Sequence, residues 1–262
     1  MKFSQSVLSL LCVVAWCANG AQATSIFEYS WPASGLTPSI VDLSPAGNNA
    51  TPGNATTSAM IPPGAPIGTE SLSTIDGGAV TQATDLLENA AIEAAGGFRF
   101  ATQFLWDGTN DTGSPILIQK IIDYAGTESL QIEDINLTSG TATLRFLFND
   151  AVEGPTTTIV ANQWYDVSAV FSPTAGVQGD GSLPGVAILT VDGNSVSEPI
   201  SKTTFGDSLN RPIGIGALSV APNIIELHGF IYNPSVTLIP EPASLGLALL
   251  GLAGIALGRR VR

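Results

Sequence analysis

Cysteine and histidine are almost absent from this chain of 262 residues. Both cysteines, Cys12 and Cys17, lie within the N-terminal segment 1–23, and His228 is the single histidine. Residues 24–238 therefore cannot form disulfides, thiolate metal sites or paired histidine ligands. A body of this length without such cross-links can still bury a core large enough to stabilise its fold.

Basic residues are also scarce, with nine Lys and Arg against 22 Asp and Glu. Between residues 24 and 238 the sequence has five basic and 21 acidic residues, a formal charge of −16 (five minus 21). Negative charge of this density repels phosphate backbones and anionic lipids, so we predict no nucleic-acid binding. Calcium ions and neutral sugars remain compatible partners, and the acidic surface also favours solubility.

The N-terminal segment 1–23 has the pattern of a secretory signal peptide. Lys2 supplies a basic start, residues 7–18 are apolar, and Ala21 and Ala23 give the small-x-small pattern of a cleavage site. We expect cleavage after Ala23 and export of the remaining chain.

The C-terminal end carries a second terminal signal. Pro240, Glu241 and Pro242 cannot continue a helix or strand, so we expect an exposed, extended segment there. The uncharged apolar run 243–258 predicts a membrane helix of about 24 Å, shorter than a hydrocarbon core of about 30 Å. Such a helix inserts but anchors weakly, so the expected membrane association is transient.

Three arginines, Arg259, Arg260 and Arg262, follow this helix. Basic residues stay on the cytoplasmic side, which places the body outside the inner membrane. Residues 239–262 together resemble the PEP-CTERM sorting signal of bacterial envelope proteins. The resemblance implies that an exosortase-type membrane protease cuts near Pro-Glu-Pro and releases the protein or transfers it to the cell surface. The alternative is an ordinary C-terminal membrane anchor.

Alternation of apolar and polar residues with a period of two dominates the body and predicts an all-β protein. One face of the strand 98–106 is expected to be buried: Phe98, Phe100, Thr102, Phe104 and Trp106. The other face carries Arg99, Ala101, Gln103 and Leu105. Further strands are expected at Pro115–Ile122, Ser129–Leu137, Thr141–Phe148, Thr156–Val160, Trp164–Phe171, Val186–Val191 and Ile224–Tyr232.

Three local features complete the expected single-domain architecture. Asp192-Gly193 predicts a tight hairpin with a strand returning from it. A short peripheral helix is expected from Asp85, with Glu88 in its capping box, to the stop at Gly96-Gly97. Residues 47–68 are rich in Pro, Gly, Thr, Asn and Ala and predict a long surface loop.

Five short motifs follow one another along the body: Asp42–Ala50 (DLSPAGNNA), Phe104–Trp106 (FLW), Asn162–Val167 (NQWYDV), Val191–Asn194 (VDGN) and Leu227–Pro234 (LHGFIYNP). In this order they resemble a laminin-G-like domain of the broader concanavalin A-like family. The resemblance implies that residues 24–238 form a jelly-roll sandwich of two antiparallel sheets, with the first strand near Phe27 beside the last near Val236. Pro234 and Ser235 stand where such domains usually have charged or bulky residues.

The segment 107–113 (DGTNDTG) joins two expected strands and is the best candidate for a binding site. Asp107, Asn110 and Asp111 group oxygen donors of the kind that calcium prefers. Asx turns use the same residues without a metal, so both interpretations stay open.

Tryptophans provide a second kind of candidate. Trp106 could stack on a sugar ring, or it could fill the core as tryptophans in strands usually do. Trp31 and Trp164 are expected in the core.

Catalytic patterns are weak. A retaining glycosidase needs two carboxylates about 5.5 Å apart, which one strand supplies at i and i+2, and no two acidic residues here have that spacing. Glu133 and Asp134 are adjacent, so a strand sends them to opposite faces. Residues 206–209 (GDSL) spell the nucleophile block of an esterase family, but Ile225 stands where that family has the aspartate three residues before its histidine. We therefore expect His228 to be a sheet residue that is bonded locally or meets water.

These observations predict a non-enzymatic exported protein of the bacterial cell surface or extracellular matrix. Its domain is expected to be lectin-like and to bind glycan or to act in adhesion, with extracellular polysaccharide and an exosortase-type protease as partners. Two alternatives stay open. The first is a carbohydrate-active enzyme of the glycoside hydrolase type whose site combines several strands, and the second is a purely structural matrix component.

Overall fold

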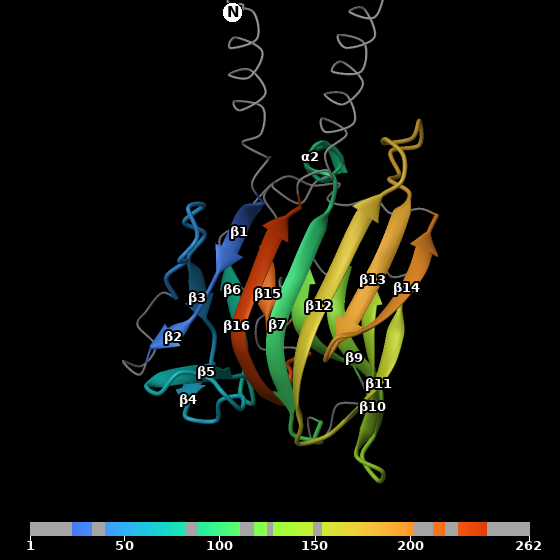
Figure 1. Cartoon of the computed structure of the whole chain (residues 1–262). Coiled ribbons are helices and arrows are strands. Elements are labelled where there is room, and N and C mark those ends of the chain that lie inside the picture. Colours follow the sequence, from blue (N-terminus) through green and yellow to red (C-terminus); the bar gives the residue numbers. More distant parts are fainter. Residues whose placement is uncertain are drawn as a thin grey trace, which may run out of the picture.

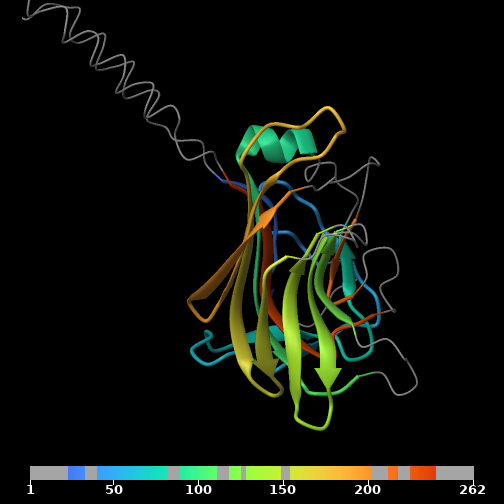
Figure 2. The same cartoon turned by 90° about the vertical axis from the view of Figure 1, so that its right-hand side faces the viewer.

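Two antiparallel sheets packed face to face form the body of the protein (Figure 1, Figure 2). The computed structural model describes residues 23–32, 40–81, 89–110, 118–124, 128–148, 154–201, 212–217 and 225–239. The predicted all-β sandwich of two antiparallel sheets is confirmed over these residues.

The nine-stranded sheet has the order β14-β13-β12-β7-β16-β5-β2, with β1 paired to β16 and β4 paired to β5. Its strands are β1 (Thr24–Glu28), β2 (Trp31–Pro32), β4 (Thr56–Ser58), β5 (Thr69–Ser73), β7 (Phe98–Trp106), β12 (Trp164–Pro173), β13 (Gly185–Val191), β14 (Asn194–Ile200) and β16 (Gly229–Leu238). The seven-stranded sheet has the order β11-β10-β9-β8-β15-β6-β3. Its strands are β3 (Ala50–Pro52), β6 (Ala79–Thr81), β8 (Gln119–Tyr124), β9 (Glu128–Asn136), β10 (Thr141–Leu147), β11 (Thr156–Val160) and β15 (Ile213–Ile215).

The hydrophobic core lies between the two sheets. The residues of β7 predicted to share a buried face do so: Phe98, Phe100, Phe104 and Trp106 are fully buried, and Thr102 is 4% exposed. Phe98 packs edge-on against Phe146 of the opposite sheet, with ring centroids 6.0 Å apart. Because burial of one such side chain contributes about 1.5–3 kcal/mol, aromatic packing can join the sheets without a disulfide.

Most strand positions agree with the sequence prediction. The bounds of β7 and β11 are as predicted, and those of β9, β10, β12 and β13 differ by at most two residues. The strand expected at Ile224–Tyr232 is confirmed only over residues 229–232, because β16 starts at Gly229 and continues to Leu238. A bulge at Asn233, whose φ is 48°, shifts the register and lets the strand continue past Pro234.

The prediction of one long loop over residues 47–68 is also wrong, because β3 and β4 lie within it. Each of these strands has three residues, too few to show a period, and each exists through pairing with a partner, β6 for β3 and β5 for β4. Residues 59–68 between β4 and β5 do form a loop, with glycines at φ 85° in its two turns.

Two pairings implied by the sequence are confirmed. The hairpin between β13 and β14 turns at Asp192 and Gly193, both with positive φ (48° and 80°). At the start of the body, β1 lies beside β16 with Phe27 opposite Val236, as the family resemblance implies.

The helix α2 (Asn89–Ala95) lies across one end of the sandwich (Figure 2). Ile92 is its buried anchor, and Glu93 on the same helix accepts a hydrogen bond from the Val177 amide at 3.2 Å. The helix ends at Gly96, whose φ is 87° and whose amide donates to the Ile92 carbonyl at 2.9 Å. The predicted glycine stop is confirmed, whereas Asp85 and Glu88 lie outside the described residues.

Residues 1–22 and 240–262 lie outside the described residues, so the signal peptide (1–23), its cleavage site and the sorting signal (239–262) stay predictions. Within the part of the chain that the structure describes, no helix is both long enough and apolar enough to cross a membrane.

Candidate functional site

The outer face of the nine-stranded sheet carries an apolar row that crosses three strands. Trp164 of β12 lies opposite Leu105 of β7, and Leu105 lies opposite Phe230 of β16. These three residues, called the apolar row below, point away from the core because their neighbours Tyr165, Phe104 and Ile231 are buried in it.

The two aromatic rings of the apolar row remain accessible. Trp164 and Phe230 are half-buried, whereas Leu105 between them is only 7% exposed. Among the described residues neither ring packs against another aromatic ring, in contrast to the phenylalanines of the core. The prediction of Trp164 as a core residue is therefore wrong, since the alternation along β12 directs it outward.

A polar row runs beside the apolar row, two residues further along each strand. Asp166, Gln103 and Tyr232 lie opposite one another on β12, β7 and β16 and are called the polar row below. Asp166 is exposed and Gln103 half-buried. The Tyr232 hydroxyl donates to Thr69 Oγ1 at 3.3 Å, so β5 also borders this face.

The backbone under the polar row is held by the neighbouring hairpin. The Asp166 amide donates to Asp192 Oδ1 at 2.9 Å, and the Asp192 amide donates to the Asp166 carbonyl at 2.9 Å. The Asp166 carboxylate therefore extends from a fixed backbone, and the Asp192 carboxylate is engaged by the amide beneath it.

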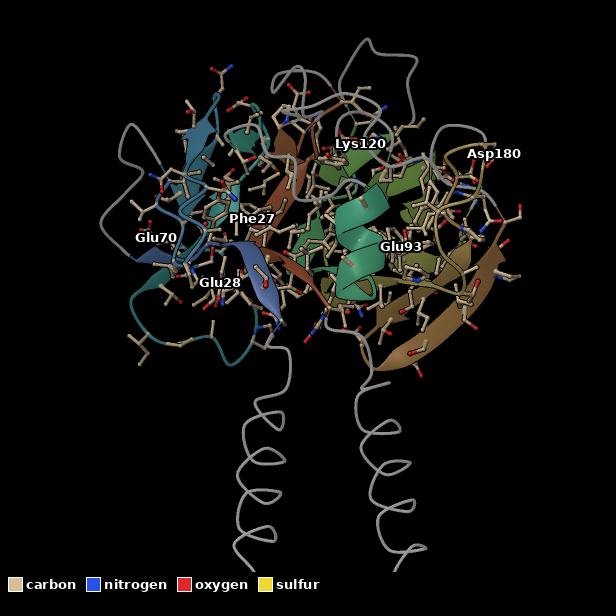
Figure 3. All side chains as sticks on the ribbon, turned by 90° about the horizontal axis from the view of Figure 1, so that it is seen from above. Phe27, Glu28, Glu70, Glu93, Lys120 and Asp180 are labelled. Atoms are coloured by element: carbon tan, nitrogen blue, oxygen red, sulfur yellow. The ribbon has the colours of Figure 1, made fainter. Side chains whose placement is uncertain are left out.

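The outer face of the seven-stranded sheet carries a different arrangement, a buried polar ladder on β8, β9 and β10. The ladder consists of Lys120, Asp123, Ser129, Gln131, Glu133 and Arg145. Figure 3 labels Lys120, whose ammonium lies 2.8 Å from Ser129 Oγ, 2.7 Å from Gln131 Oε1 and 3.3 Å from Asp123 Oδ1. Two of the ammonium hydrogens thus have a hydrogen-bond acceptor, and Asp123 is the ion-pair partner of the ammonium.

The ladder continues through Gln131 to a second ion pair. Gln131 Nε2 donates to Glu133 Oε2 at 3.0 Å, and Glu133 Oε1 pairs with Arg145 Nε. The side chains of Lys120 and Asp123 are 6% and 0% exposed, and those of Glu133 and Arg145 are 16% and 14% exposed. The ladder contains two cations and two carboxylates, so its formal charges cancel. This pairing explains how charged side chains are buried here, and their burial leaves little surface for a ligand.

Asp134 does not join this ladder. It occupies a bulge of β9 with φ 50° and is exposed, whereas the adjacent Glu133 is held by Gln131 and Arg145. The two neighbouring carboxylates therefore have separate environments, as expected of adjacent strand residues.

The predicted calcium segment contains an Asx turn in its described part. Asp107 Oδ1 accepts from the Thr109 amide at 2.8 Å and from the Thr109 hydroxyl at 2.6 Å. Asn110 Oδ1 lies 3.4 Å from Gln119 Nε2, and Asp111 lies outside the described residues. No group of three or more His, Cys, Asp or Glu residues suited to a metal occurs in the described ranges. Calcium binding stays a prediction, which a calcium titration of the melting temperature tests.

Trp106 and His228 also lie at this end of the sheet. Trp106 is fully buried and its indole donates to the Thr109 carbonyl at 3.0 Å, so the hypothesis that it stacks on a sugar is wrong. His228 Nδ1 lies 3.3 Å from Thr109 Oγ1, and its amide donates to Gln119 Oε1 at 3.0 Å. The histidine has local hydrogen-bond partners, as predicted, but it lies just before β16 and not within a sheet. Residues 206–209 lie outside the described residues.

The first sequence motif has a structural role. Asp42 accepts hydrogen bonds from the amides of Glu28, Ser44 and Asn48, each at 2.8 Å, and from the Ser44 hydroxyl at 2.7 Å. Burial, together with the nearby Asp42 charge, raises the pKa of Tyr29 far above its usual value. The motif therefore folds a turn against β1 and leaves no free carboxylate oxygen for a ligand.

Comparisons with known proteins give structural similarities only. No protein-family model and no curated protein matches the chain. Domain 4 of AbnA, an extracellular GH43 arabinanase from Geobacillus stearothermophilus solved with arabinotriose, is 12% identical, with 83% of this chain and 93% of that chain covered and a TM-score of 0.48. A protein of unknown function from Shewanella oneidensis MR-1 is 14% identical (92% and 96% covered, TM-score 0.41), and an alginate lyase Aly36B mutant solved with alginate tetrasaccharide is 8% identical (84% and 98% covered, TM-score 0.37). Similarities this weak assign neither a family nor a ligand.

Proposed function

We propose that this chain is an exported, non-enzymatic protein of the bacterial cell surface or extracellular matrix that binds glycan on the outer face of its nine-stranded sheet. The supporting observation is the apolar row beside the polar row. Aromatic rings cover the C–H faces of sugars, and amide, carboxylate and hydroxyl groups next to them hydrogen-bond the sugar hydroxyls.

Accessibility favours this face over the buried ladder. Trp164, Phe230, Gln103 and Asp166 all retain exposed surface, whereas Lys120 and Gln131 are at most 5% exposed and already bonded to each other. A sugar can reach the first set without displacing an existing ion pair.

Binding without catalysis is the role that the polar row supports. It contains one carboxylate, Asp166, and the neighbouring Asp192 is bonded to the Asp166 amide. Glycosidases of the usual kind place two carboxylates on either side of the bond that they cleave.

A glycan array tests the proposal. The mature protein should be retained on at least one polysaccharide without releasing reducing sugar, and Trp164→Ala should lose retention. Val160→Ala, which shortens a 47% exposed side chain on the other sheet, is the matched control and should keep it. Release of reducing ends would favour the carbohydrate-active enzyme, and no retention at all would favour a structural matrix component.

Export and processing need a separate test, because the two terminal signals support this part of the proposal from sequence alone. Cell fractionation followed by mass spectrometry should find a mature chain that begins at Thr24 and ends near Pro240–Pro242. An intact chain recovered from the cytosol would contradict export, and an intact C-terminus in the membrane would indicate an ordinary anchor in place of exosortase-type processing.

A further inference from the structure

We infer that this face takes an extended chain of neutral sugars, laid across the strands so that Trp164 and Phe230 cover rings one disaccharide apart. The inference rests on the proposed function and names the class of glycan. It follows from the spacing of the apolar row, from the position of the polar row and from the charges on this face.

The spacing of the apolar row matches two contacts on one chain. Trp164 and Phe230 both lie opposite Leu105, one strand to either side of it. Two strand spacings amount to about 9.6 Å. This distance is close to the length of a disaccharide repeat in an extended glycan. Leu105 is recessed at 7% exposure, so the sugar between the two covered rings would meet a lower surface.

The polar row fixes the direction of the chain. It runs parallel to the apolar row at two residues along each strand, a separation of about 7 Å. A glycan chain that follows the apolar row therefore presents one edge of hydroxyls to Gln103 and Asp166 along its length. A chain aligned with the strands would contact one aromatic ring only.

The charges on this face favour neutral sugars. The two rows contain one charged residue, the exposed Asp166. Arg99 lies six residues before Leu105 on β7 and donates to Ser168 Oγ at 2.8 Å. Since the body carries a formal charge of −16 between residues 24 and 238, uronates and sulfated sugars would approach against its field.

Calorimetric titration with oligosaccharides of defined length tests the inference. The probes are β-1,4-linked glucose, xylose and mannose oligomers from monosaccharide to hexasaccharide, with oligogalacturonates as the anionic comparison. For at least one neutral series, affinity should rise at least about tenfold between monosaccharide and trisaccharide. Oligogalacturonates should bind more weakly than this series at the same length.

Variants that lack one aromatic ring distinguish loss of the glycan contact from a folding defect. Trp164→Leu and Phe230→Leu keep apolar bulk but remove a ring, and each should weaken hexasaccharide binding at least about tenfold. Trp164→Phe should retain most of the affinity, and Val160→Ala should be unchanged, with melting curves recorded for all four.

Three results would overturn the inference while the proposed function stands: a monosaccharide that binds as tightly as the hexasaccharide, a preference for oligogalacturonate, or loss of binding in Trp164→Leu but not in Phe230→Leu. Absence of binding to every glycan, on the array as well as in the titrations, would instead overturn the proposed function, and the inference with it.

Discussion

The outer faces of the two sheets place their polar side chains in opposite environments. Both faces carry polar groups from three neighbouring strands. On the seven-stranded sheet these groups pair with one another, so that Lys120 has two hydrogen-bond acceptors, an ion-pair partner and almost no exposure. On the nine-stranded sheet Gln103 and Asp166 stay accessible beside two rings. In this protein the ladder of charged residues contributes to stability, whereas the polar row, which has a single charge, is the surface suited to a ligand.

Removal of Lys120 should give the largest effect, a loss of unfolding free energy. Lys120→Ala takes the ammonium from beside the buried Asp123, and breaking a buried ion pair from one side costs about 3–5 kcal/mol. Urea unfolding measures the loss. Arg99→Ala removes an exposed cation from the other sheet and should change the unfolding free energy by less than about 0.5 kcal/mol. Equal effects of the two variants would break the distinction between the faces.

Interruption of the ladder in its middle should have a smaller effect on stability and none on binding. Gln131→Leu removes the acceptor of Lys120 and Ser129 and the donor to Glu133, which should cost about 1–3 kcal/mol of unfolding free energy. Glycan affinity should stay at the wild-type value. A variant that folds but binds more weakly would assign the ladder to the binding site.

The complementary change on the open face is Asp166→Asn. It keeps the shape of the side chain and removes the one charge of the polar row, so the loss of a charge-assisted hydrogen bond should weaken glycan binding by about fivefold to tenfold. The melting temperature should stay within the error of the wild type, because the carboxylate is exposed. A large drop in melting temperature with unchanged affinity would reverse the roles given to the two faces.

The salt concentration should have the smallest effect, on glycan affinity. Because the inferred ligand is neutral, raising the sodium chloride concentration from low to high should alter its affinity by less than about twofold, although salt screens exposed charges. A steep salt dependence of binding would point to an ionic ligand and to Arg99 or the ladder as its contact.

Local features of the fold could be predicted from the sequence because each is encoded within a few residues. Period-two alternation located the inner face of β7, and the Asp192-Gly193 dipeptide located a hairpin. The strands β3 and β4 escaped prediction because three residues show no period. The extent of β16 could be predicted only in part: alternation indicated a strand up to Tyr232 and the family resemblance a last strand near Val236, but the bulge that joins both into one strand depends on pairing with β7.

The candidate site could be predicted only in part. Alternation placed Gln103 and Leu105 on one face of β7, but it does not say which residues of distant strands lie beside them. Pairing with β12 and β16 brings Trp164 and Phe230 to Leu105, and this register depends on the whole sheet. The same holds for the ladder, in which Lys120, Gln131 and Arg145 come from three separate strands.

The position of β16 also has a mechanical consequence. This strand lies between β7 on one side and β1 and β5 on the other, and its last residue, Leu238, pairs with both Phe98 and Thr24. A pull on the chain beyond Ile239 would act along the strand axis and load these perpendicular hydrogen bonds together. If the cell tethered this body by its C-terminal tail, the force would load the hydrogen bonds of β16 in shear. These bonds would then resist together and would not break one after another.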